Sequence, residues 1–114
     1  MKIGLIGAGR LGICLALLIE QEGYHVIASD MREDYIKDLQ NKKVIRESDI
    51  IFTLVQTPSL EDGSYDVSAV WKVVEDIKQE MSSIANYPKS FVVGCTTNPG
   101  DCDKFKDALP ESVD

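Results

Sequence analysis

The sequence is poor in cysteine and has no long apolar run. Its three cysteines, Cys14, Cys95 and Cys102, form no CxxC pair, and this odd set predicts a reducing compartment without a disulfide framework. Cys14 lies in an apolar helical pattern and is expected to be buried as a small hydrophobic side chain. The apolar stretch from Leu11 to Ile19 is too short to span a bilayer, and Arg10 interrupts any signal-like segment. We therefore expect a cytoplasmic protein.

Positive charge is also scarce, with 12 Lys and Arg against 19 Asp and Glu and a formal net charge of -7. Such a chain repels a nucleic-acid backbone and an anionic membrane, so neither is an expected partner. The single histidine, His25, opens an expected strand and is read as a surface or hydrogen-bonded residue rather than a catalytic one. The length of 114 residues and the 44% hydrophobic content fit one folded domain, residues 1–114.

Apolar runs and helical periods alternate along the chain. Strands are predicted at Lys2 to Ile6, His25 to Ser29, Asp49 to Gln56 and Ser90 to Cys95; helices are predicted from Gly9 to Glu22, about Glu33 to Gln40, Asp66 to Met81 and about Cys102 to Leu109. The first helix is apolar nearly all round and should be buried, with Gly23 ending it. This alternation predicts an α/β protein with a doubly wound parallel sheet. Between Gln40 and Asp49 there is no room for another strand and its crossover helix, so the usual third strand is expected to be missing.

The most informative motif is Gly7-Ala8-Gly9-Arg10-Leu11-Gly12, a GxGxxG run that follows a strand and opens a helix. This is the dinucleotide-binding fingerprint of a Rossmann-type fold. Gly7 would allow the tight turn, Gly9 would let backbone approach a pyrophosphate, and Gly12 would let helix and strand pack closely. The pyrophosphate would lie at the helix N-terminus, against free N–H groups.

Asp30, at the end of the second strand, should accept hydrogen bonds from the ribose hydroxyls and repel the extra phosphate of NADP. NAD is therefore the predicted cofactor. Arg32 could neutralise such a phosphate, but we read it as a solvated surface charge. The fingerprint is shared with FAD proteins and does not by itself name the dinucleotide.

Three segments together resemble the N-terminal domain of the UDP-glucose/GDP-mannose dehydrogenase family: KIGLIGAGRLG, SDIIFTLVQTPSLEDGSYDVSAV and FVVGCTTNPG. The resemblance implies that the backbone of Leu11 meets the pyrophosphate, Asp30 the ribose, and Thr57 the cofactor beside Pro58. It also implies that Thr96 stands near the nicotinamide and helps to hold a water or substrate group; the alternative is an ordinary strand-end hydroxyl. The full set of expected cofactor contacts is Gly7, Ala8, Gly9, Arg10, Leu11, Gly12, Asp30, Val55, Thr57, Pro58 and Thr96, with Thr96 the one catalytic candidate.

The chain departs from the family pattern at several positions, namely Arg10, Tyr35, Gln56, Cys95, Thr97 and Asn98. Members of the family oxidise a sugar C6 alcohol to a carboxylate in two NAD-dependent steps, with a cysteine and a lysine in a downstream catalytic domain. That domain has no counterpart here, and Cys95 has no neighbouring histidine to activate it.

Three interpretations of the function therefore stay open. The chain is an enzyme fragment or subunit with the rest supplied by another chain or lost by truncation, a non-catalytic NAD-binding or interaction module, or a decayed product that binds nothing. A homo-oligomer or a complementing chain is the protein partner that the first interpretation allows. A nucleotide sugar would be the substrate in the first case, and the sequence does not identify which one.

Overall fold

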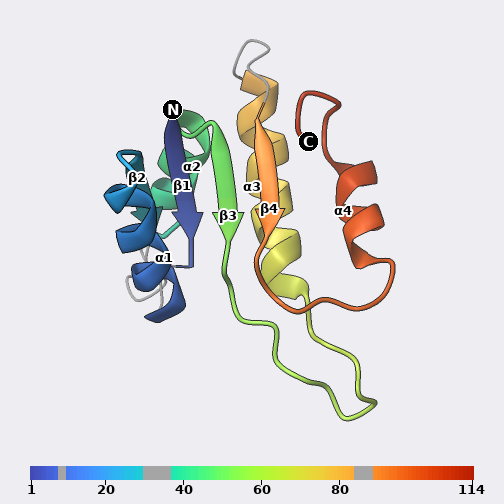
Figure 1. Cartoon of the computed structure of the whole chain (residues 1–114). Coiled ribbons are helices and arrows are strands. Elements are labelled where there is room, and N and C mark those ends of the chain that lie inside the picture. The colour runs from blue at the N-terminus through green and yellow to red at the C-terminus, as the bar shows by residue number, and fades with distance from the viewer. Residues whose placement is uncertain (8–9, 30–36, 84–88) are drawn as a thin grey trace.

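The computed structural model describes residues 1–7, 10–29, 37–83 and 89–114. It confirms the predicted Rossmann-type parallel α/β fold (Figure 1). The elements are β1 (Lys2–Ile6), α1 (Arg10–Gln21), β2 (His25–Ser29), α2 (Lys37–Glu47), β3 (Ile50–Thr53), α3 (Ser68–Ser83), β4 (Ser90–Val93) and α4 (Asp101–Ala108). The strands form one parallel sheet in the order β2-β1-β3-β4.

Helices lie on both faces of the sheet because the chain adds β2 on one side of β1 and β3 on the other. The chain passes through α1 to β2 on one side, and then returns through α2 to β3 on the other side of β1. Because parallel crossovers are right-handed, α1 covers one face and α2 and α3 lie side by side on the other (Figure 1). Helix α4 contacts α3, where the rings of Trp71 and Phe105 meet edge to face at 4.9 Å.

The hydrophobic core fills the space between the sheet and the α2–α3 layer. Its buried members come from both strands and helices and include Ile6, Val44, Ile45, Ile51, Val70, Val74, Ile77 and Phe105. The helix predicted from Asp66 to Met81 corresponds to α3, in which Val70, Val74 and Ile77 are fully buried. Just before this helix, Asp66 Oδ1 accepts a hydrogen bond of 3.0 Å from the N–H of Ser68, the first residue of α3.

The second helix differs from its prediction, because α2 runs to Glu47 instead of ending at Gln40. Its expected start near Glu33 lies outside the described residues. Val44 and Ile45, which lie beyond the predicted end of the helix, are buried on its inner face. The third and fourth strands are shorter than predicted. β3 ends at Thr53 and β4 at Val93, and each is followed by a loop at the edge of the sheet.

The prediction that the first helix is buried nearly all round is wrong. Leu17 and Leu18 are 56% and 60% exposed, and Cys14 is exposed as well. In the described part of the chain, β2 is the edge strand and no second helix lies beside α1 on its face of the sheet. Among the residues that the structure describes, the outer side of α1 therefore has no packing partner, although its sequence is apolar. Gly23 ends the helix at φ +88°, as predicted.

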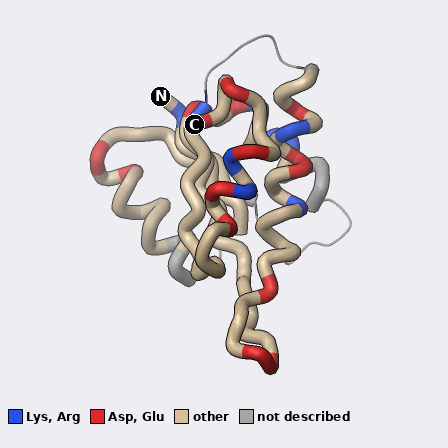
Figure 2. Tube along the Cα trace, turned by 90° about the vertical axis from the view of Figure 1, so that its right-hand side faces the viewer, with Lys and Arg blue, Asp and Glu red and all other residues tan. Residues whose placement is uncertain are grey.

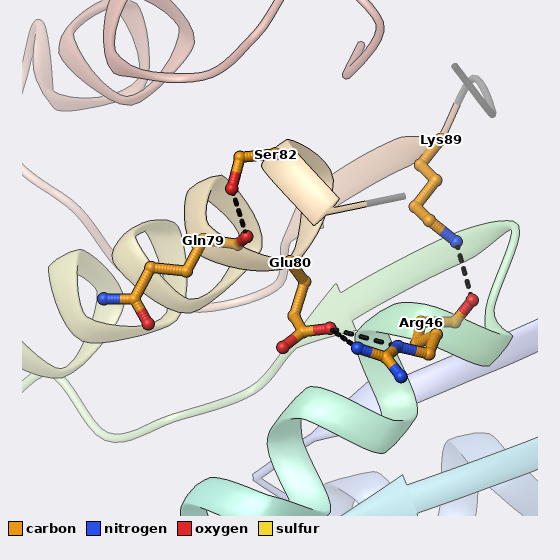
Figure 3. A network of polar contacts seen from close by, with 5 residues as sticks. All are labelled: Arg46, Gln79, Glu80, Ser82 and Lys89. Carbon is orange, nitrogen blue, oxygen red and sulfur yellow. Dashed lines mark hydrogen bonds and ion pairs between the residues drawn. The ribbon is translucent and has the colours of Figure 1, made fainter. Parts of the chain in front are cut away.

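A small polar network joins the end of α2 to α3 and β4 (Figure 3). Arg46 donates to Glu80 Oε2 through Nε and Nη2, at 3.2 and 2.9 Å. The buried Lys89 donates from Nζ to the backbone oxygens of Arg46 and Ser48, which lie at the C-terminal end of α2, where the helix dipole favours a cation. Burial lowers the pKa of Lys89 below its usual value, and the negative charge of Asp49 offsets only part of this shift.

The two edges of the sheet differ in what lies beside them. Within the described residues, no strand lies beyond β2, in agreement with the missing third strand. Beyond β4, the Phe91 N–H donates to the Asp114 carbonyl oxygen at 2.7 Å, and Lys89 pairs in parallel with Val113. None of the helices that the structure describes is both long and apolar enough to cross a membrane.

Candidate functional site

The Gly7 turn lies directly against the end of β3. Gly7 has a φ of +89°, and a Cβ added there would lie 2.9 Å from both the Leu54 carbonyl carbon and the Val55 nitrogen. Contacts under 3.0 Å essentially never occur for a real Cβ, so only glycine fits. The tight turn assigned to Gly7 from the motif is therefore observed, whereas ligand contact there remains a prediction.

The loops after β3 and β4 meet at the same edge. The Leu54 N–H donates to the Ile6 carbonyl oxygen, and the Gly94 N–H to the Thr53 carbonyl oxygen, both at 2.8 Å. A Cβ at Gly94 would lie 2.5 Å from Leu54 Cδ2. The ends of β1, β3 and β4 are thus held in close contact, as at the carboxyl ends of strands in open α/β sheets, where ligands bind. Gly94 was not predicted as a site residue, although the glycine near the end of the apolar run SFVVGC was a usable signal.

The first turn of α1 lies after the carboxyl end of β1. Arg10 and Leu11 begin the helix, and Gly12 is buried within it, as close packing on the sheet requires. The other predicted contacts of the phosphate turn, Ala8 and Gly9, and the predicted ribose ligand Asp30 lie outside the described residues.

The remaining predicted contacts lie in the loops after β3 and β4. Thr57 is half-buried, while Pro58 and Thr96 are exposed and accessible to a ligand. Val55 is 5% exposed and packs in the hydrophobic core, so its side chain points away from solvent. If Val55 contacts a cofactor, it does so through its backbone.

The charge distribution at this edge suits an anion. No acidic residue lies in the first turn of α1, and residues 54–60 and 94–100 carry no charged side chain. These two loops therefore add no carboxylate beside the positive end of the α1 dipole, which favours the two negative charges of a pyrophosphate even in a protein of net charge -7. The acidic residues Glu61 and Asp62 lie farther out, at the tip of the projecting hairpin that follows β3 (Figure 2). The residues present therefore fit a dinucleotide.

Cys95 has the surroundings of a structural thiol rather than a nucleophile. Burial raises the pKa of the Cys95 thiol, and the nearby Cys102 raises it further. Thr97 Oγ1 lies 3.8 Å from Cys102 Sγ. Among the described residues, no three His, Cys, Asp or Glu side chains gather as a metal site requires.

Asn98, one of the departures from the family pattern, has a structural role. The side chain of Asn98 bonds to the backbone of Tyr65 across 33 positions of sequence. No local sequence signal announces a contact of this kind.

Comparison with known proteins gives a family and a fold. The profile described as UDP-glucose/GDP-mannose dehydrogenase family, NAD binding domain, matches residues 40–114. The crystal structure of a ternary complex of GDP-mannose dehydrogenase from Pseudomonas aeruginosa superposes with a TM-score of 0.79 over 95% of this chain and 32% of that one. At 22% identity, this likeness shows the fold alone.

Two curated proteins are similar along nearly the whole chain. An uncharacterized protein of Methanocaldococcus jannaschii is 28% identical over 138 aligned positions, which take in 97% of this chain and 15% of that protein. A glycerol-3-phosphate dehydrogenase (NAD(P)+) of Bacillus mycoides is 26% identical over 122 positions, with 98% of this chain and 36% of that protein covered. Both alignments are longer than 114 residues, so both relatives carry residues between the matched segments that this chain lacks. That difference agrees with a sheet that lacks one strand.

Proposed function

Since this chain belongs to the UDP-glucose/GDP-mannose dehydrogenase family and matches its NAD-binding domain, we propose that it binds NAD across the carboxyl edge of its sheet. One observation carries the proposal. The Gly7 turn, the end of β3 and the end of β4 meet in backbone contact next to the N-terminus of α1, and the loops at residues 54–60 and 94–100 carry no charged side chain.

The adenosine half of NAD is assigned to β1 and β2. Backbone N–H groups at the start of α1, including that of Leu11, would hold the pyrophosphate, and Gly9 would leave room for it. The Asp30 carboxylate would accept hydrogen bonds from the ribose hydroxyls. The nicotinamide half is assigned to the loops of Thr57 and Thr96, whose hydroxyls lie on neighbouring loops of the same edge.

We further propose that the reaction served is oxidation of the C6 alcohol of a nucleotide sugar, with NAD supplying the hydride acceptor. The Thr96 hydroxyl would hold a water or substrate group by hydrogen bonding. The chain spans 15% and 36% of the two curated relatives and 32% of the similar crystallised enzyme. We therefore propose that the groups that activate the alcohol and trap the aldehyde come from another chain or a further segment, and that this chain alone is inactive.

The alternative is a non-catalytic NAD-binding or interaction module. Such a module would have the same cofactor site but would need no substrate. The two proposals therefore differ only in whether a catalytic segment associates with this chain. Adding the separately expressed catalytic part of a nucleotide-sugar dehydrogenase to this chain discriminates between them, because restored NADH formation supports only the enzyme proposal.

Calorimetric titration of the purified chain with NAD tests the cofactor proposal. The matched variant is Gly9→Val, whose branched side chain would occupy the space assigned to the pyrophosphate. We expect the wild type to bind and the variant not to bind, with the same circular dichroism spectrum for both. Equal affinity of the two proteins would mean that NAD binds elsewhere, and no binding by the folded wild type would refute the proposal.

A further inference from the structure

The chain between β3 and α3 forms a hairpin, residues 58–66, that projects from the carboxyl edge of the sheet (Figure 1). Its base is closed by an antiparallel bridge between Ser59 and Tyr65 and by a hydrogen bond of 2.8 Å from the Asp66 N–H to the Pro58 carbonyl oxygen. These bonds hold the two arms of the hairpin to each other. They do not fix how the hairpin is placed against the rest of the edge.

Asn98, in the loop after β4, joins the hairpin to that loop. The Tyr65 N–H donates to Asn98 Oδ1 at 2.7 Å, and Asn98 Nδ2 donates to the Tyr65 carbonyl oxygen at 2.9 Å. The side-chain amide thus pairs with both backbone groups of one residue, as a neighbouring strand residue would. Asparagine offers one acceptor and two donors at the required spacing, and neither aspartate nor alanine can make both bonds.

Asn98 is itself fixed to the start of α4. Its backbone N–H donates to Asp101 Oδ2 at 2.8 Å, and the Asp101 N–H donates back to the Asn98 carbonyl oxygen at 3.1 Å. Asp101 is 7% exposed and is the first residue of the helix. The backbone of Asn98 is therefore held by the buried carboxylate of Asp101.

The two loops joined in this way are the ones that carry the predicted nicotinamide contacts. Thr57 immediately precedes the hairpin, and Thr96 lies two residues before Asn98. We propose that Asn98 is a positioning residue that sets the spacing between the Thr57 and Thr96 loops and so orders the nicotinamide half of the NAD site. This inference rests on the proposed function.

The location of Asn98 makes its effect selective. The adenosine half of NAD is assigned to the Gly7–Gly12 turn and Asp30, at the ends of β1 and β2, whereas the Tyr65–Asn98 pair lies beyond the ends of β3 and β4. Loss of the Tyr65–Asn98 pair should loosen only the loops after β3 and β4. The affinity for a ligand that lacks nicotinamide should therefore stay unchanged.

The experiment compares the affinities of NAD and ADP-ribose for the wild type, Asn98→Ala and Asn98→Asp. ADP-ribose retains the adenosine and pyrophosphate and lacks the nicotinamide. We expect both variants to bind NAD roughly three- to tenfold more weakly, since two hydrogen bonds that order the loops are lost or reduced to one, while the affinity for ADP-ribose stays unchanged. The control is Ser64→Ala, which removes a hydrogen bond to Asp62 at the far end of the hairpin and leaves the Tyr65–Asn98 pair intact; it should bind both ligands as the wild type does.

Hydrogen exchange gives a second measurement that does not depend on NAD. In Asn98→Ala the Tyr65 amide should exchange faster than in the wild type, while the amides of β1 remain protected. If the wild type bound both ligands and Asn98→Ala weakened them equally or not at all, the positioning role would be refuted and the proposed function would stand. If the folded wild type bound neither ligand, the proposed function would fail, and the positioning role with it.

Discussion

Gly4 of β1 and Ser48, just after α2, are in contact so close that a Cβ on Gly4 would overlap the Ser48 hydroxyl oxygen. The same Cβ would lie 2.6 Å from Val44 Cγ1. Gly4 therefore lets the last turn of α2 rest on the central strand. This approach brings Val44 and Ile45 into the core and places the end of α2 where Lys89 can bind its carbonyl oxygens.

Replacing Gly4 with alanine should destabilise the fold. The added methyl group forces the end of α2 away from β1, and overpacking of this kind costs about 1 to 3 kcal/mol. Urea denaturation of the wild type and Gly4→Ala measures the loss. Adding Ser48→Gly to the variant should restore part of the stability, because it removes one of the two overlapping side chains; equal stability of Gly4→Ala and wild type would contradict the packing described.

The sequence predicted the elements whose signal is local. β1 and β2 begin and end where predicted, because glycine or polar residues lie directly beside each apolar run. The end of α2 was missed because Asn41, Lys42 and Lys43 interrupt its apolar pattern, and only packing against β1 reveals the continuation. The exposure of Leu17 and Leu18 was missed for a different reason: periodicity identifies an apolar surface but not whether a partner covers it.

Thr53 offers a second stability test in the core. Its side chain is fully buried at the end of β3, and within the described residues its hydroxyl has no hydrogen-bond partner. Valine has nearly the same shape without the polar group, so Thr53→Val should raise the free energy of unfolding by about 1 kcal/mol. Thermal denaturation checks this, with the exposed Thr96→Val as a control that should change little. A less stable Thr53→Val would mean that the hydroxyl does find a partner in solution.

The three cysteines should differ in their reaction with iodoacetamide. Cys14 and Cys102 are exposed, whereas Cys95 is partly buried and has a raised pKa, so less of its reactive thiolate is present at neutral pH. Mass spectrometry of peptides after timed labelling at pH 7.5 should show Cys95 modified last. Because its pKa lies above the ordinary 9.0, its rate should still rise when the pH increases beyond 9. Preferential labelling of Cys95 at pH 7.5 would instead indicate an activated nucleophile.

The candidate site was predictable to the extent that it depends on a motif. The GxGxxG run announced the Gly7 turn, and the structure shows the close backbone contact that makes glycine necessary there. The pairing of Asn98 with Tyr65 could not be predicted in the same way, since the two residues meet only because β3 and β4 are neighbours in the sheet. Contacts of this kind depend on the assembled topology.

Cofactor choice is predicted to depend on Asp30. A carboxylate that accepts hydrogen bonds from the ribose hydroxyls favours NAD and repels the added phosphate of NADP. Asp30→Asn removes the charge from these hydrogen bonds, which should weaken NAD binding by about 1 to 3 kcal/mol and narrow the preference over NADP. Calorimetry with both cofactors measures this. If the wild type bound NADP more tightly than NAD, the assignment of Asp30 would be wrong.

The final prediction concerns catalysis by the chain alone. With NAD and either UDP-glucose or GDP-mannose, the purified chain should produce no sustained rise in NADH absorbance. Oxidation of an alcohol to an acid through an aldehyde needs a hydride acceptor, a base and a covalent trap held together, and such positioning can contribute about 7 to 11 kcal/mol of the barrier. At the edge that holds the proposed cofactor site, Thr96 is the one catalytic candidate, and the raised pKa of the neighbouring Cys95 makes that thiol a poor trap. Thr96→Ala serves as the matched variant. If NADH formed steadily with the wild type and stopped in this variant, this short chain would carry a complete active site, and the proposal that another segment supplies the missing groups would be refuted.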